Sequence, residues 1–349
     1  MIYYLLAWTF LLPGALTRAR RLSGSALFFI ASFLIILIGF RHDVGCDWPA
    51  YLRTVLESYQ APWVFSPTAE SGYSLLNWIG ANWFGGVYLV NLVCAVLFVV
   101  GLLNFCRAQP RSGVALILSF PYLVTVVGMG YTRQSVAVSL SMMAILALQE
   151  NHLLKFLAWI SFASTFHRSA LVLLVLPAAT ISRSLRFATL FRLLLLSGAG
   201  IGLYYSVLAP SLEQYTSGYL ESGYQSQGAL IRLLLSFLPG ILFLYKPRAF
   251  DLTPDVRKIW FLMSLMSVLS AIAFFTVASS TAVDRIALYL LPLQLFVGSR
   301  LPDTRLFGIP PGTWKQLLIF LSFSVLIVWL NFATHAFCWL PYRNILFSI

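Results

Sequence analysis

Long apolar runs recur along the whole chain, and they limit its possible folds more than any other feature does. A helix needs roughly 20 apolar residues to cross the hydrocarbon core of a bilayer, and runs of about that length follow one another through the sequence. Hydrophobic residues make up 60% of the chain and charged residues only 10%, so an ordinary water-facing surface could not cover the apolar material. The runs are rich in Leu and lack the alternation of a membrane β-barrel. We therefore predict an all-α, polytopic integral membrane bundle.

The apolar runs predict about 12 transmembrane segments, within a range of roughly 10 to 13. No internal repeat and no linker divides the chain, so residues 1–349 are predicted to form a single integral membrane domain. The N-terminal run has neither a basic region nor a cleavage site, so it is expected to be the first span and not a removable signal. The predicted spans lie near residues 2–16, 25–40, 86–105, 113–129, 133–149, 153–165, 169–181, 190–208, 230–245, 259–279, 284–299 and 317–338.

The distribution of Lys and Arg predicts the orientation of these spans. Loops rich in these residues stay on the cytoplasmic side. With loop 17–24 placed inside, the inner loops carry the whole net charge of +12. This holds only if segment 153–181 forms two short spans that meet at an outward apex, because one long helix would move the downstream basic loops outside. The positive charge is therefore attributed to topology and to anionic membrane lipid, and no nucleic-acid partner is predicted.

Two outward loops are predicted, at residues 41–85 and 209–229. Stretches 50–59 and 73–84 of the first loop carry Tyr and Trp that suit the headgroup layer, so they are predicted as interfacial helices. The Tyr, Ser, Gln and Glu of the second loop would suit a carbohydrate-facing surface, although ordinary exposed loops have the same composition. Cys46 and Cys338 fall on the outer side without metal-type spacing, and they are expected to be structural or incidental thiols.

Charged residues at the outer ends of the spans are candidates for function. An Arg near the membrane centre costs roughly 2.5–3.5 kcal/mol on insertion scales, so a membrane protein rarely keeps one without a reason. The first such cluster contains Arg41, Asp43 and Asp47. If the segment is helical, the two carboxylates share a face, whereas a turn at Gly45 would bring both near Arg41. The cluster could bind or deprotonate a sugar hydroxyl beside an anion-binding Arg, or it could be a helix-end ion-pair cluster.

Two further clusters open predicted spans. Arg133 follows Tyr131 at an outer turn and begins a helix, where backbone N–H groups and a guanidinium together can bind phosphate. The alternative is that Arg133 reaches toward the interface without a ligand. Asp284 can cap another span while Arg285 points into the bundle, or the two can form a simple cap and ion pair.

A fourth cluster, His167 and Arg168, lies at the apex between two short apolar segments. His167 could serve as a general base or hydrogen-bond donor and Arg168 as a phosphate ligand, or His167 could be a satisfied structural histidine. Several guanidinium groups and a few carboxylates on one side of a membrane match an amphipathic anion, such as a lipid with a pyrophosphate head and a sugar beyond it. The chain has no P-loop, GxGxxG, HExxH or GxSxG motif, so no nucleotide cofactor is indicated. No metal is indicated either, although paired acids such as Asp43 and Asp47 could hold one.

Five segments in shared order resemble the EpsG family of bacterial polysaccharide polymerases, which are related to the Wzy-type polymerases of O-antigen and capsule. They are GFRHDVGCDWPAY, ESGYSLLNWIG, GYTRQSVAVSL, FHRSALVLL and DRIALY. The resemblance is good over residues 25–180 and rests on Asp284 and Arg285 in the C-terminal third. It implies a fold like that of membrane glycosyltransferases that use lipid-linked sugars, in the bacterial cytoplasmic membrane, with the active site facing the periplasm or exterior.

The same resemblance implies a reaction and roles for the residues. A growing glycan on undecaprenyl pyrophosphate would pass to a sugar hydroxyl of another lipid-linked repeat unit. Arginines would stabilise the pyrophosphate leaving group, and an acid or histidine would accept the hydroxyl proton; which of Asp43, Asp47 and His167 does so is left open. The candidate catalytic residues are Asp43, Asp47, His167 and Arg168, and the candidate substrate-binding residues are Arg41, Arg133, Arg285, Glu70, Tyr73, Tyr131 and Asp284.

Other functions fit the same charges. A flippase or transporter of lipid-linked oligosaccharide also needs cationic groups, but it would place them through the depth of a path between two similar halves. A membrane acyltransferase or ligase acting on surface glycans would use a catalytic His. The expected partners are the lipid-linked oligosaccharide, membrane lipid and a chain-length regulator protein.

Overall fold

The computed structural model describes residues 1–17, 19, 21–64, 70–180, 186–204, 229–276 and 280–347. These residues are helical apart from turns, loops and an isolated β-bridge between Arg41 and Asn344, which confirms the all-α prediction. In chain order the helices are α1 (Ile2–Leu16), α2 (Gly24–Gly39), α3 (Trp48–Glu57), α4 (Ser71–Asn82), α5 (Gly86–Ala108), α6 (Ser112–Ser119), η1 (Phe120–Gly128), α7 (Thr132–Gln149), α8 (Leu153–Phe166), η2 (Arg168–Val175), α9 (Leu176–Thr180), α10 (Arg186–Leu203), α12 (Ala229–Tyr245), η4 (Pro247–Phe250), α13 (Pro254–Thr276), α14 (Ser280–Ala287), η5 (Leu288–Leu290), α15 (Pro292–Thr304), η6 (Leu306–Gly308), α16 (Pro311–Phe332) and η7 (Ala336–Cys338).

The apolar composition of the helices fits a membrane protein. Within the described residues, α5, α13 and α16 are long and apolar enough to cross a bilayer, and six further apolar segments are shorter. Segment 153–181 is broken at His167, where the backbone is extended, so the prediction of two short helical segments is confirmed. The total of about 12 spans stays a prediction.

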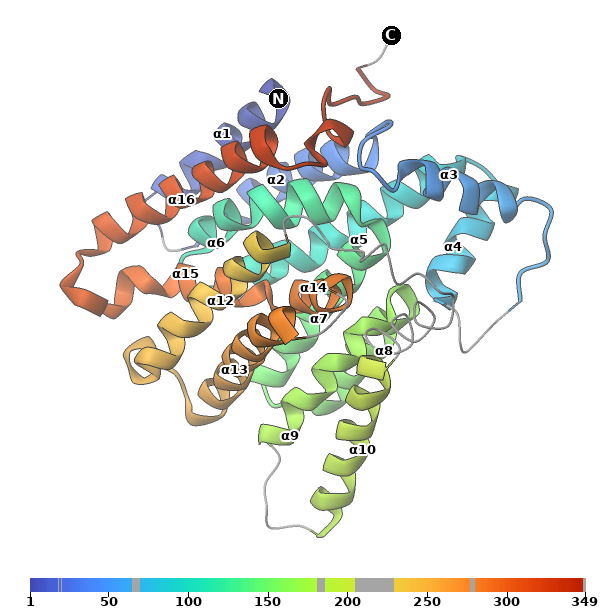
Figure 1. The fold of residues 1–349 in the computed structure, drawn as a ribbon. Helices are drawn as coiled ribbons and strands as arrows, with labels where there is room; N and C mark the ends of the chain where they lie inside the picture. The colour runs from blue at the N-terminus through green and yellow to red at the C-terminus, as the bar shows by residue number, and fades with distance from the viewer. Residues whose placement is uncertain are drawn as a thin grey trace.

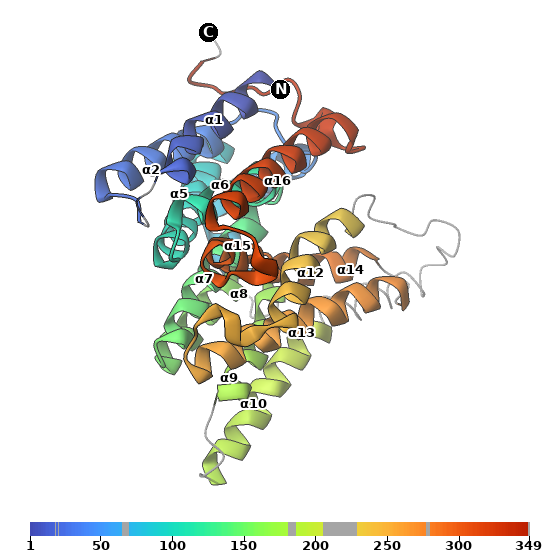
Figure 2. The same cartoon turned by 90° about the vertical axis from the view of Figure 1, so that its left-hand side faces the viewer.

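Helix α7 lies inside the bundle and packs against α5 and α8. Its contact with α5 is close because small residues meet there: a Cβ atom on Gly101 would lie 2.7 Å from the backbone oxygen of Ser139. The Ser139 hydroxyl donates to the carbonyl of Leu97, 3.2 Å away. Small residues and hydroxyls of this kind hold helices together where neighbouring lipid supplies no hydrophobic driving force. The remaining helices surround this core, with α1, α2 and α16 on one side and α10 at the far edge (Figures 1 and 2).

Helices α3 and α4 lie together at one end of the bundle, here called the α3–α4 end (Figure 1). They occupy the stretches that the aromatic residues predicted as interfacial helices. Of the two predicted outward loops, 41–85 is described except for residues 65–69. The loop 209–229 falls outside the described residues except for Ala229.

The C-terminal segment closes over the turn that joins η1 to α7. Pro121 interrupts normal α-helical bonding near the start of η1, a π-helix. The indole nitrogen of Trp339 donates to the carbonyl of Thr125, 2.8 Å away. Gly130 is needed beneath this ring, since a Cβ atom there would lie 2.4 Å from Cζ2 of Trp339.

A disulfide between Cys46 and Cys338 fastens the same segment to the loop before α3. The two Cα atoms are 5.1 Å apart, although 292 positions separate the residues in sequence. Beside it, the backbone N–H of Gly45 donates to the Cys338 carbonyl at 2.8 Å, and Gly45 has a φ of 98° that favours glycine. The sequence did not predict this pairing, although it allowed a structural role for both residues. Cys94 and Cys106 are buried free thiols.

The disulfide should contribute measurably to stability. A Cys46→Ser/Cys338→Ser double variant should lose about 2–4 kcal/mol of unfolding free energy, because a crosslink over a long loop restricts the unfolded chain. Thermal unfolding of purified protein in detergent would measure the loss. The control is reductant, which should lower the melting temperature of the wild type and leave the double variant unchanged. Equal melting temperatures for the oxidised wild type and the double variant would contradict this assignment.

Candidate functional site

A cavity of about 760 Å³ lies at the α3–α4 end of the bundle. Four arginines and three carboxylates contribute to its lining, so its charge is positive on balance. The charged, histidine and tyrosine residues that line it are Asp47, Tyr51, Glu70, Tyr73, Tyr131, Arg133, His167, Arg168, Arg232, Asp284 and Arg285. The fold thus collects these groups from α3, α4, α7, α8, η2, α12 and α14 into one place.

The Glu70 carboxylate connects three of these helices. Its Oε2 lies 2.6 Å from Nη1 of Arg133, and its Oε1 lies 2.5 Å from Nδ1 of His167. Glu70 directly precedes α4, Arg133 is in the first turn of α7, and His167 joins α8 to η2. A carboxylate only accepts hydrogen bonds, so this contact requires a proton on Nδ1 of His167. In the neutral imidazole, Nε2 is then left as the acceptor.

The close approach of α4 to α8 depends on Gly72. A Cβ atom at this position would lie 2.4 Å from Oγ1 and 3.0 Å from Cβ of Thr165, near the end of α8. A side chain at position 72 would force the Thr165 hydroxyl to turn away and the rest of Thr165 to give by a few tenths of an ångström. Gly72 therefore sets the spacing that lets Glu70 reach His167.

Tyrosine side chains fix the start of α7 and hold Arg133 in place. The hydroxyl of Tyr51 accepts from the N–H of Thr132 at 3.0 Å and donates to the carbonyl of Gly130 at 3.2 Å. The guanidinium carbon of Arg133 lies 5.6 Å from the centre of the Tyr73 ring, within cation–π range. A guanidinium has five N–H donors, so its bond to Glu70 leaves others for a ligand.

A second ion pair contributes to the cavity from α12 and α14. Nη2 of Arg232 lies 3.0 Å from Oδ2 of Asp284, and Nη1 donates to the Tyr131 hydroxyl at 3.2 Å. The next residue, Arg285, is exposed, and its backbone carbonyl accepts from Gln134 at 3.2 Å. Within the described parts of the chain, no carboxylate pairs with the Arg285 guanidinium.

Two predicted site residues, Arg41 and Asp43, lie outside the cavity. Arg41 is completely buried, and its guanidinium donates to Ile38 O, Asn91 Oδ1 and Thr132 Oγ1. Arg41 therefore has a structural role, because these hydrogen bonds join α2, α5 and the start of α7. Asp43 has a φ of 52° and sits in a turn, so the helical alternative for this cluster is wrong.

The turn at Gly45 separates the two acids of the first cluster, so the alternative in which it brings both near Arg41 is wrong as well. Asp43 is exposed and lies 3.4 Å from Arg343, whereas Asp47 lines the cavity. Burial raises the pKa of Asp47, and the nearby charges of Arg133 and Arg285 oppose that rise. Among the described residues, no three His, Cys, Asp or Glu lie close enough to hold a metal ion.

The pKa of the Glu70 carboxyl group is shifted downward, in contrast to that of Asp47. Burial alone would raise its pKa, but the hydrogen bond and charge of His167 and the charge of Arg133 outweigh burial. The pKa of Glu70 therefore lies below its usual value of 4.5, and the carboxylate stays ionised.

Sequence reasoning missed Arg232, Tyr51 and Gly72 as contributors to this site. The sequence analysis did not single out Arg232, and it treated Tyr51 only as one of the aromatic residues of the predicted interfacial stretch 50–59. The available signal for Arg232 was its place at the outer end of a predicted span, the same signal that identified Arg133 and Arg285. Nothing in the local sequence marks Gly72 as a contact point, because Thr165 is far away along the chain.

Comparison with protein families gives a match to the EpsG family model over residues 25–344. The chain belongs to the EpsG family. This confirms the resemblance seen in the sequence motifs and extends it through the C-terminal third. EpsG is a Wzy-like polysaccharide polymerase family, so the general role of the chain is in polysaccharide polymerisation. Searches of curated proteins and of solved structures gave no match.

The Glu70 carboxylate should make the stability of this EpsG protein depend on pH. Because its pKa is lower in the folded state, its contribution is complete above the unfolded value of 4.5 and declines as pH falls below it. Thermal unfolding from pH 7 to pH 3.5 should therefore show the wild type more stable than Glu70→Gln at neutral pH, with the difference shrinking in acid. Asp43→Asn is the control: its ion pair is exposed, so its effect should be small throughout. A difference for Glu70→Gln that stays constant with pH would refute this.

Proposed function

We propose that this protein joins lipid-linked oligosaccharide repeat units at the cavity of the α3–α4 end, on the extracytoplasmic face of the bacterial cytoplasmic membrane. The growing glycan would leave undecaprenyl pyrophosphate and bond to a sugar hydroxyl of another lipid-linked unit. The observation that carries the proposal is the convergence of Arg133, Arg168 and Arg285 with the Glu70–His167 pair around one cavity. Family membership supplies the general reaction class.

The arginines suit the pyrophosphate of the donor. As the bond between the anomeric carbon and the pyrophosphate oxygen breaks, negative charge grows on that oxygen. Guanidinium groups stay charged at any relevant pH, and they bind phosphate oxygens through a planar pair of donors. Arg133, Arg168 and Arg285 would stabilise this charge where it forms, which is the most effective way to lower the barrier.

His167 suits the role of general base. The acceptor hydroxyl forms the new bond to the anomeric carbon and gives up its proton to Nε2 of His167. Glu70 fixes the proton on Nδ1 and stabilises the imidazolium that results. Asp47 also lines the cavity, but no comparable partner orients its carboxylate among the described residues. We therefore assign the base to His167 and leave Asp47 as a contact for sugar hydroxyls.

The disulfide supports an extracytoplasmic site. Disulfides form and persist outside the cytoplasm, and Cys46 directly precedes Asp47, which lines the cavity. The distribution of Lys and Arg independently supports an outward position for the same end of the bundle. Both arguments agree with a donor carried on a membrane lipid and with an acceptor presented on the same face.

Replacing the cavity arginines should stop chain growth. Arg133→Ala and Arg168→Ala should each lower elongation on the order of 100-fold to 1,000-fold, so cells should accumulate single lipid-linked repeats in place of long glycan. His167→Asn should act similarly, through loss of the base. Glycan length on gels, and elongation of purified lipid-linked repeats by reconstituted protein, would measure this.

Two variants provide matched controls for these changes. Arg53→Ala removes an exposed arginine of α3 that does not line the cavity, and Asp43→Asn removes an acid outside it. Both should make glycan of normal length. Normal chain lengths in Arg133→Ala and Arg168→Ala at wild-type expression would refute the role given to these arginines.

The Gly72 contact offers a test of geometry without removal of a charged group. Gly72→Ala should push α4 away from α8, lengthen the distance from Glu70 to His167, and reduce elongation. Thr165→Ala removes the nearest clashing atom, Oγ1 at 2.4 Å, so it should partly restore activity to the Gly72→Ala protein. Full activity in Gly72→Ala, or no rescue in a double variant that folds, would argue against the Glu70–His167 pairing as a requirement for elongation.

A further inference from the structure

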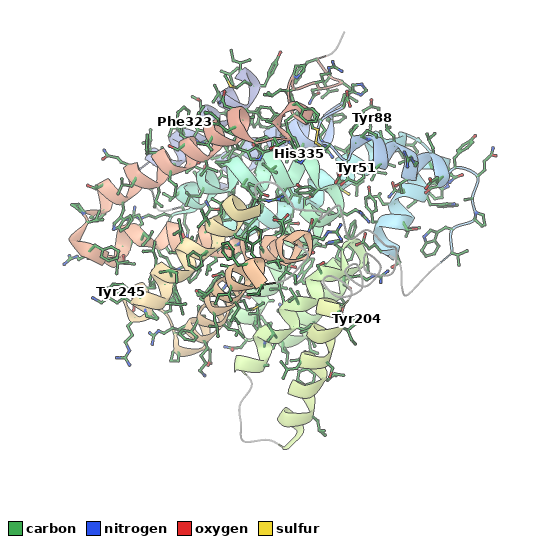
Figure 3. The ribbon with its side chains drawn as sticks, in the orientation of Figure 1. Tyr51, Tyr88, Tyr204, Tyr245, Phe323 and His335 are labelled. Carbon is green, nitrogen blue, oxygen red and sulfur yellow. A yellow bond between two sulfur atoms is a disulfide. The ribbon has the colours of Figure 1, made fainter. Side chains whose placement is uncertain are left out.

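A second cavity, of about 820 Å³, lies where α12 ends and α13 begins. Arg232, in the first turn of α12, lines the cavity described above, and Tyr245, the last residue of α12, lines this second one. At 1.5 Å per residue the two positions are separated by roughly 20 Å along the helix axis. Tyr51 and Tyr245 accordingly appear well apart in Figure 3, with Tyr51 to the right of centre and Tyr245 at the left.

The mouth of the second cavity is basic. Four cationic side chains line it, and they are Lys246, Arg248, Arg257 and Lys258. One of them, Lys258, pairs with Asp255 at 2.9 Å, which leaves three cations in excess of that pair. Positive charge at this density favours an anionic ligand.

Arg257 adds a more specific signal. Its Nη2 donates to the carbonyl of Leu252 at 2.8 Å, which fixes the direction of the guanidinium. Arg257 also lines the cavity, and a guanidinium has five N–H donors, so it keeps further donors for an oxygen of a bound phosphate.

An apolar surface continues from this basic mouth along the helices. On α13 the exposed side chains Phe261, Leu265 and Leu269 follow one another at four-residue spacing, so they lie on one face. Leu238 and Ile241 of α12 are exposed on the neighbouring helix, and the two helices pack together. Phe261 and Leu265 themselves line the cavity, so charge and apolar surface meet within it.

We infer that this cavity binds an anionic glycerophospholipid, with the phosphate among Lys246, Arg248 and Arg257 and the acyl chains along the exposed faces of α12 and α13. A soluble phosphorylated ligand would match the cations but would leave the apolar stripe uncovered. A membrane phospholipid matches both parts, and basic pockets at the ends of membrane helices bind such headgroups. The inference concerns binding at the end of α12 remote from the candidate active site, and it holds whether or not the proposed reaction is right.

Native mass spectrometry of the purified full-length protein would test this site, with phosphatidylglycerol and phosphatidylcholine as probes. The wild type should retain phosphatidylglycerol in preference to phosphatidylcholine. A Lys246→Gln/Arg257→Gln double variant should bind phosphatidylglycerol about 25-fold more weakly, from about fivefold for each cation removed. Arg107→Gln/Lys155→Gln, which removes two exposed cations outside the cavity, should bind it like the wild type.

Two results would contradict the binding of an anionic phospholipid at this cavity. Equal retention of the two lipids by the wild type would overturn the inference, even if no variant could be purified. So would equal losses in the cavity variant and the Arg107→Gln/Lys155→Gln control, since that would show attraction to the overall charge only. If the double variant fails to fold, as judged by its elution from a sizing column, the exposed Lys246→Gln alone should still weaken binding about fivefold.

Discussion

The contact of the Glu70 carboxylate with Arg133 and His167 determines the geometry of the candidate site. Each of the three residues belongs to a different helical segment, so the ion pairs hold together the N-terminal ends of α4 and α7 and the break after α8. This arrangement is possible because Gly72 lets α4 approach Thr165 and because Tyr51 fixes the turn before α7. Charge alone would not produce it, since the attraction of Glu70 for Arg133 and His167 becomes a direct contact only at this spacing of the helices.

Two arginines show how burial divides similar residues between different roles. Arg41 and Arg133 both lie at the outer ends of predicted spans, and both looked like ligands for an anion. The Arg41 side chain is completely buried and bonded to Ile38, Asn91 and Thr132, whereas about half of the Arg133 side chain is exposed in the cavity. Arg41 therefore supports the start of α7 through the Thr132 hydroxyl, and of these two arginines only Arg133 lines the cavity.

Much of the fold could be predicted because apolar helices leave a local signal. The break at His167 followed from the charges of the downstream loops, and the outer arginines followed from the cost of placing a guanidinium near lipid. Contacts between distant parts of the chain leave no such signal. The disulfide of Cys46 with Cys338, the pairing of Arg232 with Asp284, and the small gap beside Gly72 each depend on how helices pack, which no single stretch of sequence reveals.

The central claim is that the cavity at the α3–α4 end holds the pyrophosphate of a lipid-linked glycan. Electron cryomicroscopy of the protein in nanodiscs with a lipid pyrophosphate oligosaccharide would test it most directly. We expect phosphate density within hydrogen-bonding distance of Arg133, Arg168 and Arg285, with a sugar hydroxyl near Nε2 of His167. Pyrophosphate density bound elsewhere, with this cavity holding only solvent, would contradict the account.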